Sequence, residues 1–322
     1  MSSTALHVVT GKGGTGKTTT AVALALALAD RGQRVLVCEV EGRQGIAQLL
    51  DVAPLPYEER RVATGLGGGE VFALAIDAES ALLEYLDMFY RLGRAGKALD
   101  RFGVIDFATT IAPGVRDVLL TGKIYEIARR RGQHQDTGPL YDAIVIDAPP
   151  TGRITRFLNV SAEVAGLAKV GPIRRQSDAI TEMMRSEATR VHLVTVLEEM
   201  PVQETLDGIA ELHAAGLPVG HVVVNLVRAA LVSDETAAAL EDGILDAAAV
   251  AGVLTGAGLD PDVAAALLAG GRGHLERQAL QQSQRDLLAA DATPTVELPV
   301  VERTDLGGLL ELAGLLREGS LA

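Results

Sequence analysis

The residues best suited to chemistry form a glycine-rich segment near the start of the chain. Residues 11–18 read Gly-Lys-Gly-Gly-Thr-Gly-Lys-Thr and fit the spacing G-x-x-x-x-G-K-S/T. Glycines at this spacing let the backbone curl so that its N–H groups point at phosphate oxygens. We therefore predict a nucleotide site in which Lys17 reaches the terminal phosphates and Thr18 binds Mg²⁺. The predicted binding residues are Gly11, Gly13, Gly14, Thr15, Gly16, Lys17, Thr18 and Thr19.

A carboxylate at the end of a later strand is the expected partner for the metal. The apolar run at residues 143–147 ends in Asp147. A carboxylate in this position holds Mg²⁺ directly or through water in phosphate-transferring enzymes. Many strands end in aspartate, so this signal is weak alone and gains weight from the glycine-rich loop. We predict that Thr18 and Asp147 together hold the metal.

Two segments resemble those of a known family. Lys12 adds a second lysine to the loop, in the pattern K-G-G-x-G-K-T, and residues 147–152 read Asp-Ala-Pro-Pro-Thr-Gly. Both resemble motifs of the ArsA-like and tail-anchored-protein-targeting ATPases, which have a deviant Walker A P-loop. The variant motifs look most like those of the paired actinobacterial anion-transporting-ATPase-like proteins. The resemblance implies an ATPase that uses ATP and Mg²⁺.

The same resemblance implies a dimer. In the family, the lysine at the position of Lys12 reaches the nucleotide of the opposite subunit, so Lys12 is a predicted catalytic residue. A cation delivered across an interface can neutralise charge on the phosphates as an arginine finger does. The plainer alternative for Lys12 is a solvated surface lysine.

The segment that should position the attacking water departs from the family pattern. Where the family has Asp-Pro-Ala-His, residues 41–44 read Glu-Gly-Arg-Gln, so Glu41 takes the place of the catalytic aspartate. A longer side chain can still orient a water, but a misplacement of about 1 Å can cost roughly 100-fold in rate. We therefore expect hydrolysis that is slow or is completed by a partner subunit. We favour Arg43 and Arg153 as surface or interface arginines over catalytic ones.

Two strand ends resemble the family's base-binding elements. Asn225 ends the apolar run at residues 222–225, where the family reads adenine with an asparagine amide. Pro299 lies in Glu-Leu-Pro at residues 297–299, which is similar to the loop that covers the ring. Each is an ordinary strand end by itself, and together with the loop they favour ATP over GTP.

The elements that must position these residues alternate between strands and helices. Short runs rich in β-branched residues occur at 5–10, 34–40, 71–76, 143–147, 191–197, 221–225 and 295–299. Helical segments separate most of them, including an Ala/Leu-rich helix at 17–30, which is typical of parallel βαβ units. We predict an α/β fold with a doubly wound, mainly parallel sheet of seven or eight strands. The glycines at 65–69 are expected to form a flexible connector.

We predict a single P-loop ATPase domain over residues 1–322 with two helical insertions. They cover about 78–131 and 233–291, the second with expected breaks at 260–261 and 270–273. The first insertion carries five of the ten aromatic residues between positions 85 and 107. These aromatic residues form either the insertion's own core, which we favour, or a groove for an apolar helix. The apolar helix expected at 305–322 should pack on the sheet.

Composition excludes several classes of protein. The formal net charge is −13, which argues against binding nucleic acid through its phosphates. With Cys38 as the single cysteine, the chain cannot build a multi-cysteine zinc clip or arsenite site, and neither is expected. We find no signal peptide and no apolar run that could span a membrane, so we expect a cytoplasmic protein.

The expected function is a Mg²⁺-dependent ATP switch. Its expected partner is a second copy or a related ATPase subunit, and its client is a protein or a membrane-associated species. The alternatives are an ATPase of the partitioning or positioning type and a weakly active regulatory ATPase subunit. The charge disfavours DNA partitioning, and Glu41 keeps the regulatory alternative open.

Overall fold

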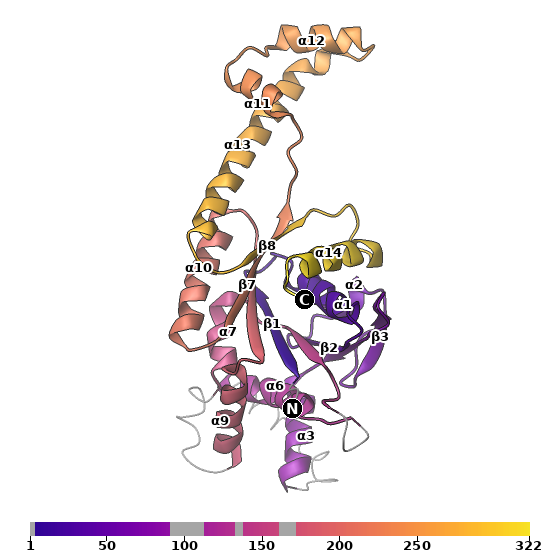
Figure 1. The fold of residues 1–322 in the computed structure, drawn as a ribbon, viewed down its shortest axis with the longest axis vertical. Coiled ribbons are helices and arrows are strands. Elements are labelled where there is room, and N and C mark those ends of the chain that lie inside the picture. Colours follow the sequence, from indigo (N-terminus) through magenta and orange to yellow (C-terminus); the bar gives the residue numbers. More distant parts are fainter. Residues whose placement is uncertain (1–3, 91–112, 133–137, 161–171) are drawn as a thin grey trace.

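One eight-stranded sheet runs through the body of the protein (Figure 1). The computed structural model describes residues 4–90, 113–132, 138–160 and 172–322. The strand order is β3-β4-β2-β5-β1-β6-β7-β8, and every pair except β3–β4 is parallel. The predicted runs correspond to β1 (Ala5–Gly11), β2 (Arg34–Glu39), β4 (Glu70–Ala75), β5 (Ala143–Asp147), β6 (Thr189–Thr195), β7 (Val219–Val227) and β8 (Thr295–Pro299). The predicted α/β, doubly wound fold is confirmed.

The strand that sequence patterns missed is β3 (Arg60–Thr64), which pairs antiparallel with β4 at the sheet edge. The glycine cluster that joins them is a tight turn, so the expectation of a flexible connector is wrong. The Gly65 N–H donates to the Gly69 carbonyl at 2.8 Å. A Cβ on Gly67 would lie 1.9 Å from the Asp30 carbonyl oxygen. The turn therefore needs glycine because it lies directly against Asp30, the residue that follows the helix α1 (Lys17–Ala29).

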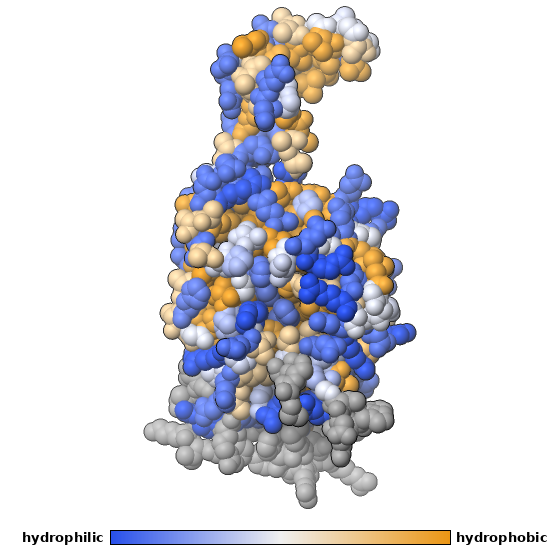
Figure 2. Space-filling model, viewed as in Figure 1, coloured by the Kyte–Doolittle hydropathy of each residue, from blue (hydrophilic) through white to orange (hydrophobic). Residues whose placement is uncertain are grey.

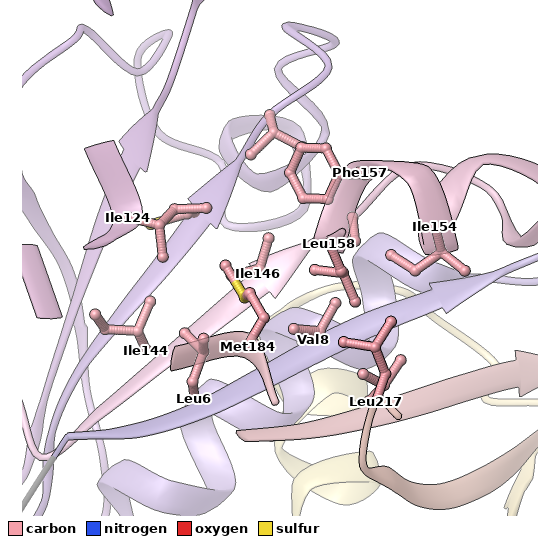
Figure 3. Close-up of a cluster of buried hydrophobic side chains, with 14 of the residues drawn as sticks. Leu6, Val8, Ile124, Ile144, Ile146, Ile154, Phe157, Leu158, Met184 and Leu217 are labelled. Atoms are coloured by element: carbon pink, nitrogen blue, oxygen red, sulfur yellow. The ribbon is translucent and has the colours of Figure 1, made fainter. Parts of the chain in front are cut away.

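Helices cover both faces of the sheet. On one face lie α1 (Lys17–Ala29), the short α2 (Gly45–Leu49) and α14 (Leu306–Glu318), which share a core with β-strand residues such as Val9 and Val37. On the other lie α6 (Pro113–Ala128), α7 (Thr151–Leu158), α9 (Pro172–Met184) and α10 (Glu199–Ala214). Figure 3 shows this second core, where Phe157 and Met184 meet strand residues such as Val8 and Ile146.

The Ala/Leu-rich helix α1 is buried along nearly its whole length, from Thr20 to Ala29. The predicted helix near the C-terminus packs with α1 and β8, and its Leu309, Leu312 and Leu316 are buried there. Its apolar side is therefore used inside the fold.

The second insertion forms an arm, residues 228–291, that extends away from the sheet (orange to yellow in Figure 1). It contains α11 (Asp234–Glu241), α12 (Ala247–Gly256), the 3₁₀ turn η1 (Pro261–Val263) and α13 (Ala264–Ala289). The expected break at 270–273 is wrong, because α13 continues through it. A Cβ on Gly271 would lie 3.2 Å from Leu240 of α11, so a small residue here lets the two helices pack closely.

The first insertion contributes α3 (Ala78–Tyr90) and α6, which pack together. Lys123 of α6 donates to Glu84 of α3 at 2.6 Å. The aromatic side chains from position 85 to 107 lie outside what the structure describes, so the choice between core and groove stays a prediction. Among the described residues, we find no helix with the length and apolarity needed to cross a bilayer.

Candidate nucleotide-binding site

The predicted site residues lie close together at the carboxyl ends of β1, β2 and β5. These three strands are adjacent and parallel, so their carboxyl ends share one edge of the sheet. The register places Glu39 and Val9 directly beside Asp147 on the two sides of β5. In open α/β sheets this edge is where ligands bind.

The glycine-rich loop links β1 to α1 and is fixed by a side chain from β7. Gly16 stands directly before α1 with φ +92°, and a Cβ there would lie 2.2 Å from Nδ2 of Asn225. The same Nδ2 donates to the Thr15 carbonyl at 2.9 Å, and Asn225 is buried. Gly16 is therefore required both by its left-handed backbone and by the close approach of Asn225.

Lys17, Thr18 and Asp147 come together as predicted from the sequence. The Thr18 hydroxyl donates to Asp147 Oδ2 at 2.7 Å, and Lys17 Nζ donates to the Lys12 carbonyl at 3.2 Å. Burial lowers the pKa of the Lys17 ammonium, while the carboxylates of Asp147 and Glu41 oppose that change. Burial raises the pKa of Asp147 to about 6 against the opposing effects of the Thr18 hydrogen bond and Lys17. The pocket thus holds a buried carboxylate that a cation would stabilise.

A cavity of about 270 Å³ opens between the loop and β2. It is lined by Gly14, Gly16, Lys17, Thr18, Thr19, Glu39, Glu41, Arg43, Gly45, Asp147 and Ala148. The donors suit Mg²⁺, which prefers oxygen ligands and is usually held by one or two protein oxygens together with phosphates. The Thr18 hydroxyl and the Asp147 carboxylate supply such oxygens next to each other.

Glu41, the predicted water-positioning carboxylate after β2, is ion-paired with two arginines. Its Oε2 is 3.2 Å from Nη2 of Arg43, and its Oε1 is 3.3 Å from Nη1 of Arg153 on α7. Arg153 Nη2 also lies 3.7 Å from Asp117 of α6. The carboxylate lines the loop cavity and also a neighbouring hollow of about 620 Å³. Arg153 is therefore an ion-pair partner of Glu41 in this structure.

The sequence of residues 4–187, more than half of the chain, matches the family described as anion-transporting ATPase. The chain belongs to this family. It is 52% identical over 321 residues to the ATPase BagA of Mycobacterium tuberculosis, an alignment that covers 99% of this chain and 94% of BagA. The expected family relationship is confirmed.

More distant family members are the arsenical pump-driving ATPases. The chain is 28% identical over 250 residues to that of Acidiphilium multivorum and 27% identical over 236 residues to that of Escherichia coli. These alignments cover 72% and 67% of this chain but only 41% and 38% of the two pump proteins. The chain therefore spans about two fifths of their length.

Lys12, the second lysine of the glycine-rich loop, is ion-paired with an acidic residue of the same chain. Lys12 Nζ is 3.3 Å from Glu204 Oε2 on α10, and both side chains are about one third exposed. Thr15 Oγ1 donates to the Lys12 carbonyl at 2.9 Å, so the backbone of Lys12 helps to close the loop. The side chain of Lys12 is ion-paired and reachable from solvent at once.

The other predicted binding residues lie at three places. Gly11 is the last residue of β1, and Gly13 and Gly14 form the bend of the loop. Thr19 is in the first turn of α1 and lines the cavity. Pro299 ends β8 and pairs with Val227, two residues beyond Asn225 on β7.

Sequence reasoning missed Glu39, which is buried and lines the cavity beside Asp147. Its carboxylate accepts the backbone N–H of Gln44 and, at 3.3 Å, that of Ile46. These N–H groups open the short helix α2, so Glu39 holds the segment after β2 in place. The available signal was an acidic residue at the end of an otherwise apolar buried strand, the pattern that identified Asp147.

Proposed function

We propose that this family member is a dimeric, Mg²⁺-dependent ATP-binding and ATP-hydrolysing switch, built as one P-loop domain with two helical insertions. The observation that carries the proposal is the convergence of Lys17, Thr18 and Asp147 around one cavity at the glycine-rich loop. A glycine-rich backbone, a half-buried ammonium and a hydroxyl–carboxylate pair are the combination that a nucleoside triphosphate with its metal requires.

The roles of the residues follow from charge and position. The loop N–H groups and Lys17 would bind the phosphates, and Thr18 and Asp147 would hold Mg²⁺, which would supply positive charge to the phosphate oxygens. Glu41 orients the water that attacks the terminal phosphate. Glu41 is ion-paired with two arginines. Before Glu41 can position that water, Arg153 must therefore move away from the carboxylate, or the two side chains must reorient together.

The base site is proposed at the ends of β7 and β8. Asn225 and Pro299 lie on neighbouring strands, and the Asn225 amide oxygen and nitrogen can pair with an adenine edge. In this structure Nδ2 of Asn225 donates to the Thr15 carbonyl. To bind the base, Nδ2 must donate a second hydrogen bond, or the side-chain amide of Asn225 must rotate slightly.

The partner is proposed to be a second copy or a related ATPase subunit. Lys12 would leave Glu204 and enter the site of the opposite subunit, which couples ATP to dimerisation. The client is proposed to be a protein or a membrane-associated species, because the charge of −13 does not suit nucleic acid.

A weakly active regulatory subunit is the second candidate. The observation that favours it is the double ion pair of Glu41, which holds the proposed catalytic carboxylate on Arg43 and Arg153. The two candidates predict different rates of phosphate release. The rates to compare are those of the chain alone and of the chain with a related ATPase subunit.

The test is phosphate release by the full chain and its Lys17→Ala variant. We expect release to fall by roughly 100-fold or more in the variant, because the phosphates lose a charge-assisted contact. The matched control is Arg60→Ala, which removes an exposed cation on β3 outside the cavity. Measurable release that is equal in the wild type and Lys17→Ala would refute the site. No release from the wild type, alone or with a related ATPase subunit, would refute the hydrolysis but not the binding of ATP.

A further inference from the structure

The end of the arm carries apolar side chains that the fold does not cover. Helix α12 has no buried residue. Ile244 is 70% exposed, Val253 72% and Leu259 59%. Figure 2 shows the resulting apolar surface gathered at the far end of the arm. Contiguous apolar surface on a soluble protein commonly marks a place where a partner binds.

The local sequence also gives α12 little stability of its own. It is 10 residues long and contains Gly252 and Gly256, and isolated helices of this length are marginal in water. Its N-terminus is capped by Asp246, which accepts the Ala249 N–H at 2.8 Å. Among the helices and strands that the structure describes, those with appreciable contact to α12 are η1 and α13. A partner packed on α12 would therefore stabilise it.

The charge around this apolar surface has one sign. Between residues 229 and 271 the chain has seven acidic residues and no lysine or arginine. All seven acidic side chains are exposed; they are Asp234, Glu235, Glu241, Asp242, Asp246, Asp260 and Asp262. We call residues 233–263, which include all of them, the arm tip. It therefore combines an uncovered apolar helix with a rim of negative charge.

We infer that the arm tip is a docking surface for a basic amphipathic helix of a partner protein. The apolar side of such a helix would cover Val253 and its neighbours, and its lysines and arginines would reach the acidic rim. The charge argues for this occupant over the others. The tip of a second copy carries the same negative charge, and an anionic lipid surface would be repelled.

The base of the arm is anchored to the body of the protein. Arg285 of α13 is 2.6 Å from Glu297 of β8, and Leu288 is buried in the core of the body. The arm leaves the sheet at residue 228, three positions after Asn225, which contacts the glycine-rich loop.

The test measures binding of a synthetic peptide by fluorescence anisotropy, with the full chain. The probe is a labelled peptide with leucine on one helical face and lysine on the other, and its matched control replaces every lysine with glutamate. We expect saturable binding of the lysine peptide that weakens as salt is raised, and no binding of the glutamate peptide.

Two variants locate the site. The triple substitution Ile244→Ser, Val253→Ser and Leu259→Ser should weaken binding by about tenfold or more, because it removes the exposed apolar contacts. Replacing Glu241 and Asp242 with glutamine and asparagine should weaken binding and flatten its salt dependence. The control Leu66→Ser removes a side chain that is 81% exposed on the turn between β3 and β4, far from the tip, and should change nothing.

Three outcomes would overturn the inference. They are equal peptide binding by the wild type and the triple variant, tip-dependent binding to vesicles of anionic lipid without peptide binding, and tip-dependent self-association in sedimentation. ATP binding, measured on the same variants, should remain at the wild-type value. A failure of this inference is thus separate from a failure of the nucleotide site.

Discussion

Three carboxylates lie at the nucleotide cavity, and each has a different kind of partner. Asp147 accepts the Thr18 hydroxyl, Glu39 accepts backbone N–H groups of the α2 region, and Glu41 is paired with arginines. Asp147 suits a metal because its partner, the Thr18 hydroxyl, offers a second oxygen beside the carboxylate. Glu39 is occupied in holding the backbone. Glu41 alone is held by exposed side chains that can move away, so it is the residue best placed to act on water.

Replacing Glu41 by Gln tests this division. We expect phosphate release to fall by roughly tenfold or more with ATP affinity unchanged within about twofold, because an amide is a poorer acceptor for the water's proton. Rates and nucleotide affinities of purified protein are the measurement. Glu70→Gln, on an exposed ion pair with Arg61, serves as the matched control. A Glu41→Gln protein with full activity would remove this residue from the mechanism.

Lys12 and Glu204 offer a second test at the scale of single residues. Lys12→Ala should reduce turnover and ATP-dependent dimerisation more than it reduces nucleotide binding by the monomer. Glu204→Gln should instead favour the ATP-dependent dimer, because it releases the Lys12 ammonium from its ion-pair partner in the same chain. Mass measurements in solution with and without ATP report dimerisation, and phosphate release and nucleotide affinity of the same proteins report the other two quantities. If Lys12→Ala lowers all three quantities equally, the proposed role across an interface is wrong.

At the scale of elements, three neighbouring strands place histidines in a row. The rings of His7 of β1 and His192 of β6 stack with centroids 5.3 Å apart, and the ring of His221 of β7 lies tilted against that of His192 at 5.8 Å. His192 Nδ1 accepts the His221 backbone N–H at 3.2 Å, and His192 Nε2 lies 3.1 Å from His7 Nδ1. A neutral His192 thus carries its proton on Nε2 and donates to His7. Protonation of His7 Nδ1 would break that bond.

The row predicts that acid destabilises the fold. Burial lowers the pKa of His7 to about 4 and that of His192 well below its usual value, and the charge of Arg190 acts in the same direction. The unfolded chain therefore takes up these protons first, so stability is complete above about pH 6.5 and is lost as pH falls toward about 4.

Thermal unfolding at about pH 7.5 and about pH 5.5 measures this effect. We expect the melting temperature of the wild type to fall by about 3 °C or more, and that of His7→Gln to fall less. His213→Gln, which replaces an exposed histidine of α10, should keep the wild-type dependence. Identical pH dependence for His7→Gln and the wild type would show that the row carries none of the loss.

The sequence predicted the elements whose residues repeat a strong pattern. Seven apolar runs became strands, and the motif residues Lys17, Thr18 and Asp147 met as expected because parallel strands bring their ends together. β3 was missed because Arg60 and Arg61 give it no apolar repeat, and an edge strand next to solvent needs none. The contact of Asn225 with Thr15 joins residues 210 positions apart and depends on strand order, which no local pattern encodes.

At the scale of the whole molecule, the nucleotide cavity and the root of the arm share one edge of the sheet. β1 and β7 are separated by β6 alone and run in the same direction, so the loop after β1 and the start of the arm after β7 lie at the same end. Asn225 joins them directly. A change in the loop that displaces Asn225 would therefore reach the arm through β7, which would give the proposed nucleotide-dependent switch a short path to the arm tip.

The account depends first on whether the cavity binds a nucleotide together with a metal. Calorimetric titration of ATP into the full chain in the presence of Mg²⁺ measures this directly. We predict saturable binding with about one ATP for each cavity, weakened by roughly tenfold or more when Mg²⁺ is chelated, because the phosphates then lose the charge held at Thr18 and Asp147. The account is contradicted if no heat and no saturable uptake are seen with Mg²⁺ present, with the chain alone and with its related subunit added.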